Sequence, residues 1–139
     1  RYVERCVNDP AVIKRLLTTP ATWAVVGLSS SYRRDSYRIA KLLQEIGMRI
    51  VPVNPFVDEV HGEKAYARLE DVPFEIDVVD VFRRVPGPHV YEAMEIGANA
   101  VWMQLGVIDD VAAAAAAEGG LDVVMNRCPA IEYPRIAAS

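Results

Sequence analysis

Residues 22–47, TWAVVGLSSSYRRDSYRIAKLLQEIG, constrain the fold of this chain more than any other stretch. An apolar run from Trp23 to Val26 ends at Gly27, a polar loop follows, and apolar residues then recur at helical spacing up to Ile46. This order predicts a strand, a tight turn and a helix. Backbone N–H groups at the start of such a helix have no partner within the helix and can receive an anion. A ligand that carries phosphate is therefore our first hypothesis.

The alternation of short apolar runs with helical patterns continues along the chain. We expect strands at 22–26, 49–53, 77–81, 100–104 and 121–125, and helices at 10–17, 36–46, 88–96 and 109–118. The strands lack the apolar–polar alternation of a half-exposed sheet, so helices should cover both faces. Residues 54–76 hold Pro55 and Pro73 and predict an irregular connection with room for one short helix. The expected fold class is α/β: a Rossmann-like, open, parallel, five-stranded sheet with helices on both faces.

Three side chains are expected to cap the starts of these helices. Asp9 precedes a proline at the first helical position, and Ser36 and Asp109 stand at the start of two later helical patterns. The pair Gly119-Gly120 predicts where the last of these helices stops.

Length and composition narrow the class of protein. The 139 residues suit one domain, 1–139, with an N-terminal helix and a core at 22–136, and the hydrophobic share of 52% is enough for a buried core. A net charge of −4 argues against binding to nucleic acid or to a membrane surface. No apolar run approaches the roughly 20 residues of a membrane-spanning helix. No signal peptide is recognisable, and the two cysteines, Cys6 and Cys128, suggest neither a disulfide framework nor a zinc site, so we expect a cytoplasmic location.

Small, polar and basic residues follow the ends of the expected strands. In an open parallel sheet these ends share one edge, where ligands bind at the reversal of strand order. Five of the 15 basic residues fall in loops at this edge although the whole chain is acidic. Arginine suits phosphate because its planar fork donates paired hydrogen bonds. The five are Arg33, Arg34, Arg83, Arg84 and Arg127.

Two features of the sequence discriminate between phosphate ligands. The turn after the first strand reads G-L-S-S-S and keeps only the first glycine of the dinucleotide fingerprint G-x-G-x-x-G. Asn54 stands where a carboxylate would bind the ribose 2′-hydroxyl of NAD. A neutral residue there tolerates a phosphorylated ribose, so NADP or coenzyme A (CoA) fits better than NAD. No G-K-[ST] sequence of a Walker loop occurs.

Several segments, in this order, resemble a known family. The segments VVGLSSS, DSYRIAKLLQEIGMRIVPVNP, GEKAY, VDVFRR, AVWMQLG and LDVVMNRCPAIEYPR are similar to the small stand-alone bacterial CoA-binding proteins. These proteins are similar to the CoA-binding domains of succinyl-CoA synthetase α-subunits and of NDP-forming acyl-CoA synthetases. The resemblance covers about residues 10–136. It implies a Rossmann-like sheet that binds CoA across its carboxyl edge.

The resemblance also implies roles for particular residues. Gly27, Leu28 and Ser29 would approach the phosphates, Ser36 and Tyr37 would lie at the helix start, and Asn54 and Pro55 would border the adenosine. Phe82 and Arg83 would contact the adenine or its phosphates, and Gln104 and Gly106 would face the pantetheine arm or the pyrophosphate. Asn126, Arg127 and Cys128 would close the far side. The charge pattern adds Arg34 and Arg84 to this set.

The sequence offers little sign of catalysis. The related synthetases use a phosphorylated histidine in a further domain, which these 139 residues do not contain. The two histidines, His61 and His89, are expected in a loop and at the surface, and no residues form a recognisable acid–base pair or metal site. Cys128 is the one reactive side chain at the expected rim, and we hypothesise that it could form a mixed disulfide with the CoA thiol.

Our first hypothesis for function is a bacterial, cytoplasmic protein that binds CoA or an acyl-CoA and has no catalytic activity of its own. One alternative is an NADP-binding oxidoreductase or redox sensor. Another is the CoA-binding subunit of a multi-chain acyl-CoA synthetase, for which the sequence does not identify a partner protein.

Overall fold

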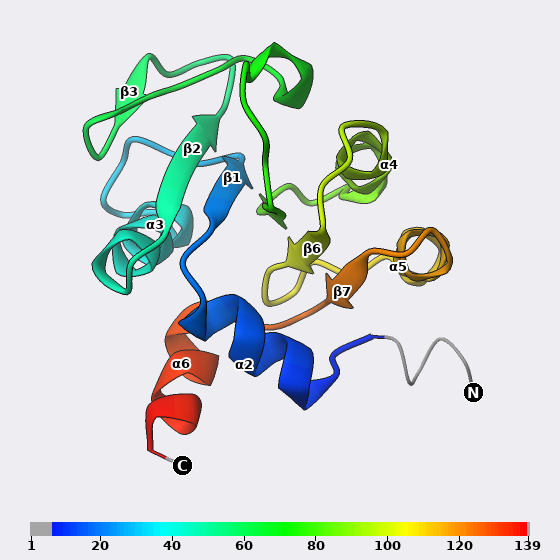
Figure 1. Ribbon diagram of the computed structural model, residues 1–139. Coiled ribbons are helices and arrows are strands. Elements are labelled where there is room, and N and C mark those ends of the chain that lie inside the picture. Colours follow the sequence, from blue (N-terminus) through cyan, green and yellow to red (C-terminus); the bar gives the residue numbers. More distant parts are fainter. Residues whose placement is uncertain (1–6, 139) are drawn as a thin grey trace.

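Five parallel strands form the centre of the protein. The structure, a computed structural model, describes residues 7–138, so Arg1 and Cys6 lie outside the described residues. The strands are β1 (Thr22–Val26), β2 (Arg49–Val53), β5 (Val78–Val81), β6 (Ala100–Met103) and β7 (Asp122–Val124). They pair in the order β2-β1-β5-β6-β7, and every pairing is parallel. The expected Rossmann-like α/β class is confirmed (Figure 1).

Helices cover both faces of this sheet, as the apolar strands require (Figure 1). One face carries α2 (Pro10–Thr18), α3 (Asp35–Glu45) and α6 (Pro129–Ala137), and the other carries α4 (Gly87–Glu95) and α5 (Asp110–Glu118). Helix α6 packs against both α2 and α3, and α4 packs against α5. Each crossover between neighbouring parallel strands therefore buries its apolar side against one face.

Successive residues of each strand serve the two faces in turn. In β1, Ala24 and Val26 join the apolar cluster under α4 and α5, whereas Trp23 and Val25 join the cluster under α2, α3 and α6. Trp23 and Trp102 have no exposed surface, and their ring centroids lie 5.6 Å apart in the second cluster. Trp102 is therefore a core residue.

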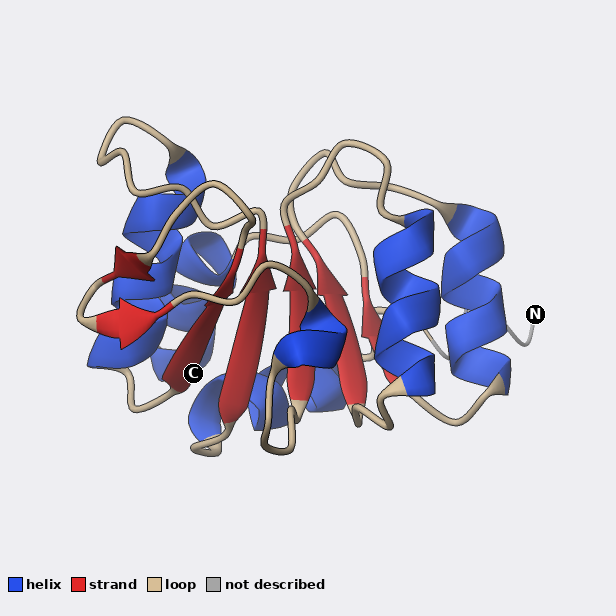
Figure 2. Cartoon of the chain, turned by 90° about the horizontal axis from the view of Figure 1, so that it is seen from above, coloured by secondary structure: helices blue, strands red, loops and turns tan. Residues whose placement is uncertain are grey.

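The chain reverses its direction across the sheet between β1 and β5. From β1 the first crossover leads through α3 to β2, and the chain then returns to β5 on the other side of β1. Figure 2 shows the strands of the main sheet pointing the same way, with long loops beyond their ends. Loops that diverge from neighbouring strand ends leave a crevice between them, which is where ligands bind in open α/β sheets.

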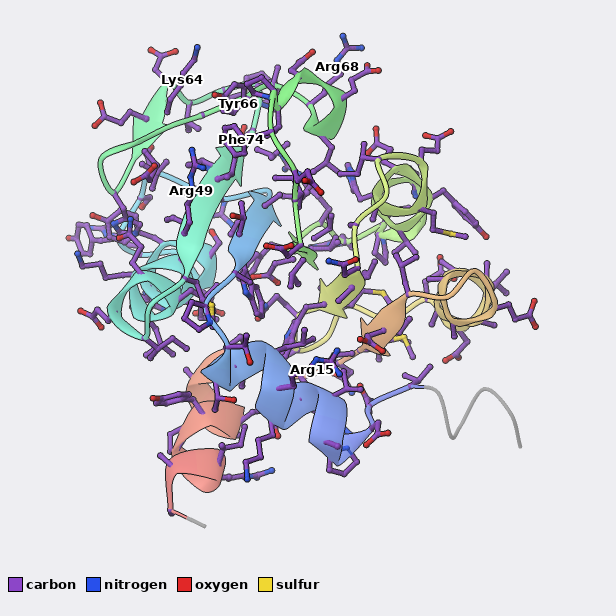
Figure 3. The ribbon with its side chains drawn as sticks, viewed as in Figure 1. Arg15, Arg49, Lys64, Tyr66, Arg68 and Phe74 are labelled. Carbon is purple, nitrogen blue, oxygen red and sulfur yellow. The ribbon has the colours of Figure 1, made fainter. Side chains whose placement is uncertain are left out.

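The connection 54–76 holds more regular structure than its sequence predicts. It contains an antiparallel pair, β3 (Glu59–Val60) and β4 (Glu63–Lys64), and the expected short helix, η1 (Leu69–Asp71). Figure 3 labels the side chains that join the connection to β2. The Arg49 guanidinium lies 3.9 Å from the centre of the Phe74 ring, and Phe74 meets Tyr66 edge to face at 6.3 Å. Nζ of Lys64 in turn lies over the Tyr66 ring, 5.2 Å from its centre.

The helix starts test the expected caps. Asp9 accepts a hydrogen bond from the N–H of Ala11, and Asp109 accepts one from Ala112, so both caps are confirmed. The expectation for Ser36 is wrong: α3 begins at Asp35 with Arg34 as its N-cap residue, and Ser36 lies in the first turn. The hydroxyl of Ser36 instead accepts a hydrogen bond from the N–H of Ser29 at 3.0 Å, because the preceding loop folds back over the helix start.

Helix α6 is absent from the sequence-based expectations. Pro134 lies in its interior and cannot donate to the carbonyl four residues earlier, which weakens the helical signal. Packing against α2 and α3 supplies the stability that local preference lacks. No helix within residues 7–138 is long and apolar enough to cross a bilayer.

We predict that Asp109→Ala lowers the free energy of unfolding by about 1 kcal/mol, because it removes the side-chain acceptor for an N–H of the first turn of α5. Asp110→Ala is the matched control, since Asp110 is exposed and stands one residue further along the same helix. Urea denaturation measures both variants. Equal losses for the two would contradict the assignment of Asp109 as the cap.

Candidate functional site

A cavity of about 880 Å³ opens at the carboxyl edge of the sheet. This volume is within the ~300–1,000 Å³ usual for small-molecule sites. The loops after all five strands contribute to the lining, together with the first turns of α3 and α6. The lining residues are Gly27, Ser29, Arg33, Arg34, Asp35, Ser36, Arg38, Ile39, Asn54, Phe82, Arg83, Gln104, Leu105, Val107, Cys128 and Ala130. The cavity therefore lies where the reversal of strand order predicts it.

Gly27 allows two of the strand ends to approach each other. Its φ of 89° lies in the left-handed region, which residues with a side chain rarely adopt. A Cβ atom there would stand 3.2 Å from Nε of Arg83 and 3.3 Å from its Cδ. The absence of a side chain at Gly27 thus lets Arg83 lie across the end of β1.

Serine hydroxyls organise the loop between β1 and α3. The N–H of Ser31 donates to Ser29 Oγ and the N–H of Arg33 donates to Ser31 Oγ, while Ser29 donates its own N–H to Ser36 Oγ. Three loop N–H groups that could have faced an anion therefore have partners in the loop itself or in the first turn of α3. The first turn of α3 still presents N–H groups that have no acceptor within the helix.

The lining is basic although the chain as a whole is acidic. It holds four arginines and a single acidic residue, Asp35, which forms an ion pair with Arg38. Within the described residues, the guanidinium groups of Arg34 and Arg83 have no hydrogen bond or ion pair. Unpaired guanidinium groups beside an open cavity attract phosphate, to which each can donate two parallel hydrogen bonds.

A buried acidic side chain lies behind the lining. Asp80 of β5 has no exposed surface and accepts a hydrogen bond from Nε2 of Gln104, which lines the cavity and is 3% exposed. Burial in the apolar core raises the pKa of the Asp80 carboxyl from 3.8 to about 8, and the hydrogen bond from Gln104 opposes this rise. Oδ2 of Asp80 and Oε1 of Gln104 are both buried without a partner among the described residues.

The structure brings together nine of the sixteen residues that the sequence suggests for the site. They come from all five strand ends. The nine that line the cavity are Gly27, Ser29, Arg34, Ser36, Asn54, Phe82, Arg83, Gln104 and Cys128. That these side chains contact a ligand stays a prediction.

Three of the remaining seven lie near the β1 and β2 ends but outside the lining. The Leu28 side chain is fully buried, and its carbonyl accepts a hydrogen bond from Asn54. Tyr37 packs its ring against that of His61, with centroids 4.1 Å apart, and Pro55 is exposed beyond β2. Asn54 thus ties two strand-end loops together in addition to lining the cavity.

The other four lie in the loops after β5, β6 and β7. Arg84 is exposed and outside the lining. Asn126, with a φ of 60°, accepts a hydrogen bond from the N–H of Gly106 at 2.7 Å. The Arg127 guanidinium donates to the carbonyls of Met125 and Asn126. Asn126 and Arg127 therefore shape the loop that places Cys128, rather than lining the cavity themselves.

Several lining residues were not among the sequence-based candidates. Arg38 follows Arg34 by four residues and so lies on the same side of α3, a spacing that could have indicated it. Leu105, Val107 and Ala130 line the cavity because of how their loops fold, and their sequence context carries no such signal. Within residues 7–138, no three His, Cys, Asp or Glu side chains gather where they could hold a metal ion.

The sheet order and the cavity define a Rossmann-like α/β domain with its candidate site at the carboxyl edge. Residues 21–134 match the family model described as CoA binding domain, and the chain belongs to this family.

Individual relatives are consistent with this membership. The chain is 39% identical over 121 residues to the uncharacterised protein YneT of Bacillus subtilis, covering 85% of this chain and 89% of that one. A hypothetical protein from Pyrococcus horikoshii superimposes with a TM-score of 0.85 at 36% identity, covering 93% and 92% of the two chains. An ADP-forming acetate–CoA ligase of Methanocaldococcus jannaschii is 33% identical over 79 residues, which are 56% of this chain but 11% of that enzyme.

We predict that Asp80→Asn removes a pH dependence from the stability of the protein. The folded carboxyl holds its proton up to about pH 8, whereas an unfolded aspartate loses it near pH 3.9. The folded state binds more protons over this range, so the wild-type free energy of unfolding falls as pH rises from about 4 to about 8. The slope approaches 1.4 kcal/mol per pH unit for a single group.

Urea denaturation at pH 5, 6, 7 and 8 measures this effect. The free energy of unfolding of Asp80→Asn, minus that of wild type, should increase with each rise in pH. Asp122→Asn is a matched control, because Asp122 is partly exposed and paired with Arg15, which Figure 3 labels on α2. A constant difference between Asp80→Asn and wild type at all four values would contradict the raised pKa of Asp80.

Proposed function

We propose that this protein binds CoA or an acyl-CoA in the cavity at the carboxyl edge of its sheet. The observation that carries the proposal is the arginine-lined cavity itself, because it concentrates unpaired positive charge in an acidic protein that belongs to a CoA-binding domain family. The pyrophosphate and the ribose phosphate of CoA supply the matching negative charge.

The chemistry of the lining suits the two ends of such a ligand. Arg34 and Arg83 lie near the Gly27 turn and the start of α3, where phosphates would be favoured by both charge and free N–H groups. Phe82 offers a ring for stacking on a base, a contact worth on the order of 1 kcal/mol. Leu105 and Val107 offer apolar surface to a pantetheine or acyl chain.

We further propose that the protein acts by binding rather than by catalysis. No histidine is among the lining residues of the described chain, and the Asp35 carboxylate is paired with Arg38. His61 instead donates a hydrogen bond from Nε2 to the backbone oxygen of Tyr37, and His89 contacts Glu92. Among the described residues, this lining holds no nucleophile with an adjacent base, the arrangement that covalent catalysis uses.

An NADP-binding role is the competing function. Asn54 lines the cavity and is neutral, so it would not repel a phosphorylated ribose. A role as the CoA-binding part of a larger acyl-CoA synthetase also stays open as a proposal, because the match to the ligase covers a small part of that enzyme.

Thermal shift with CoA, acetyl-CoA, NADP and NAD at equal concentrations tests the proposed ligand. A ligand that binds only the folded state raises the unfolding midpoint by mass action. We expect CoA and acetyl-CoA to raise it and NAD to leave it unchanged. A rise with NADP and none with CoA would overturn the proposal in favour of the dinucleotide.

We predict that Arg83→Ala weakens CoA binding without unfolding the protein. A hydrogen bond to a charged group contributes about 1.5–3 kcal/mol, so the dissociation constant should rise roughly tenfold to a hundredfold by calorimetry.

Arg68→Ala is the matched control for this loss of one positive charge. Arg68, labelled in Figure 3, is exposed and pairs with Glu70 and Asp71, and it is not among the residues that line the cavity. It should retain wild-type affinity. Equal affinity in Arg83→Ala and wild type would remove Arg83 from the site.

A further inference from the structure

One buried pair beneath the cavity has more acceptor atoms than donors to satisfy them. Asp80 and Gln104 share a single hydrogen bond, from Nε2 to Oδ1, which leaves Oδ2 and Oε1 without a donor among the described residues. Asp80 has no exposed surface and Gln104 is 3% exposed, so bulk water does not reach them freely. A buried acceptor without a donor lowers the stability of the folded state.

A proton on Asp80 changes this balance. A protonated carboxyl has an O–H that can donate to Oε1 of Gln104, while an ionised carboxylate can only accept. When Oε1 is satisfied by Asp80, the Gln104 amide keeps an N–H for a group in the cavity that it lines. When Asp80 is ionised, it attracts the amide N–H groups, and Oε1 must find its donor in the cavity.

We propose that Asp80 is a positioning residue that decides which group Gln104 presents to the bound ligand: an N–H donor while Asp80 is protonated, and a carbonyl acceptor once it is ionised. The ligand part of this inference rests on the proposed function. Phosphate and amide carbonyl oxygens of CoA are acceptors, so they bind to the donor form. Binding of CoA is therefore coupled to retention of the proton on Asp80.

The surroundings of Asp80 support this assignment. Its strand neighbours are Val25 on β1 and Trp102 on β6, both without polar contact to the carboxyl. Asp80 faces the apolar cluster under α2, α3 and α6. The titratable groups that pack on this cluster are Tyr37 of α3 and Cys128 and Tyr133 of α6, and α2 contributes the apolar residues Ile13, Leu16 and Leu17. The charged groups of the cavity above are Arg33, Arg34, Asp35, Arg38 and Arg83. None of these groups has a hydrogen bond or ion pair with Asp80 in residues 7–138.

The direction of the pH effect follows from linkage. Burial raises the pKa of Asp80 to about 8, so the donor form predominates at neutral pH and is lost above pH 8. CoA that requires this form should bind about tenfold more weakly at pH 9 than at pH 7, because one proton must be taken up with the ligand. Below pH 7 the affinity should level off.

Calorimetry of CoA binding at pH 6.5, 7.5, 8.5 and 9.0 tests the coupling. Wild type should lose affinity above pH 8, and Asp80→Asn, which carries no titratable proton, should show a flat profile. The CoA affinity of Gln104→Met should not change with pH and should be about tenfold weaker than that of wild type at pH 6.5. Gln44→Met, an amide-to-thioether change on α3 outside the lining, should keep the wild-type profile.

A fall in affinity that persists in Asp80→Asn, or a flat wild-type profile, would overturn the inference. A second measurement tests the coupling of Asp80 to Gln104 without any ligand or variant: NMR of wild type with ¹³C-labelled aspartate and ¹⁵N-labelled glutamine. The Asp80 carboxyl and the Gln104 amide should titrate together near pH 8.

These two measurements separate the inference from the proposed function. In one outcome, CoA fails to bind wild type at every pH while the Asp80 and Gln104 signals share one midpoint. In that case the proposed function is wrong, and the inference that the proton on Asp80 controls the Gln104 amide is upheld. If CoA binds but the Gln104 signal does not follow Asp80, or Asp80 titrates near pH 4, the proposed function stands and the inference is overturned.

Discussion

Parallel pairing of the five strands is the constraint on which the rest of this structure depends. Because every strand runs in the same direction, all five carboxyl ends reach one edge, and the loops that follow them meet there. The reversal of strand order between β1 and β5 makes the adjacent loops diverge, which opens the cavity. Residues as far apart in sequence as Gly27 and Cys128 thus line a single cavity.

Electrostatics in the site is decided by which charges remain unpaired. The Arg38 charge is partly offset by Asp35, and Arg127 is held by carbonyls of its own loop. Arg34 and Arg83 have no such partners within residues 7–138, so their charge is available to a ligand. A cavity whose walls focus positive potential can attract an anion even when the net charge of the protein is −4.

The polar pair beneath the cavity joins the core to the site. Asp80 occupies a strand position whose alternation would otherwise direct an apolar side chain into the cluster under α2, α3 and α6. A carboxyl there costs stability unless it is neutral and hydrogen-bonded, and Gln104 provides its one hydrogen-bond partner among residues 7–138. A residue that weakens the core in this way is expected where stability has been given up for a role in binding.

The sequence by itself determined the α/β class, the five strands, four of the helices and the caps Asp9 and Asp109, because these depend on local periodicity and on hydrogen bonds between near neighbours. It also located the loops that border the cavity. Only the tertiary structure decided that α6 forms despite Pro134, that Ser36 binds the loop instead of capping the helix, and that Arg83 but not Arg84 lines the cavity. Those outcomes, and the pairing of Asp80 with Gln104, depend on contacts between residues distant in sequence, whose balance no local pattern encodes.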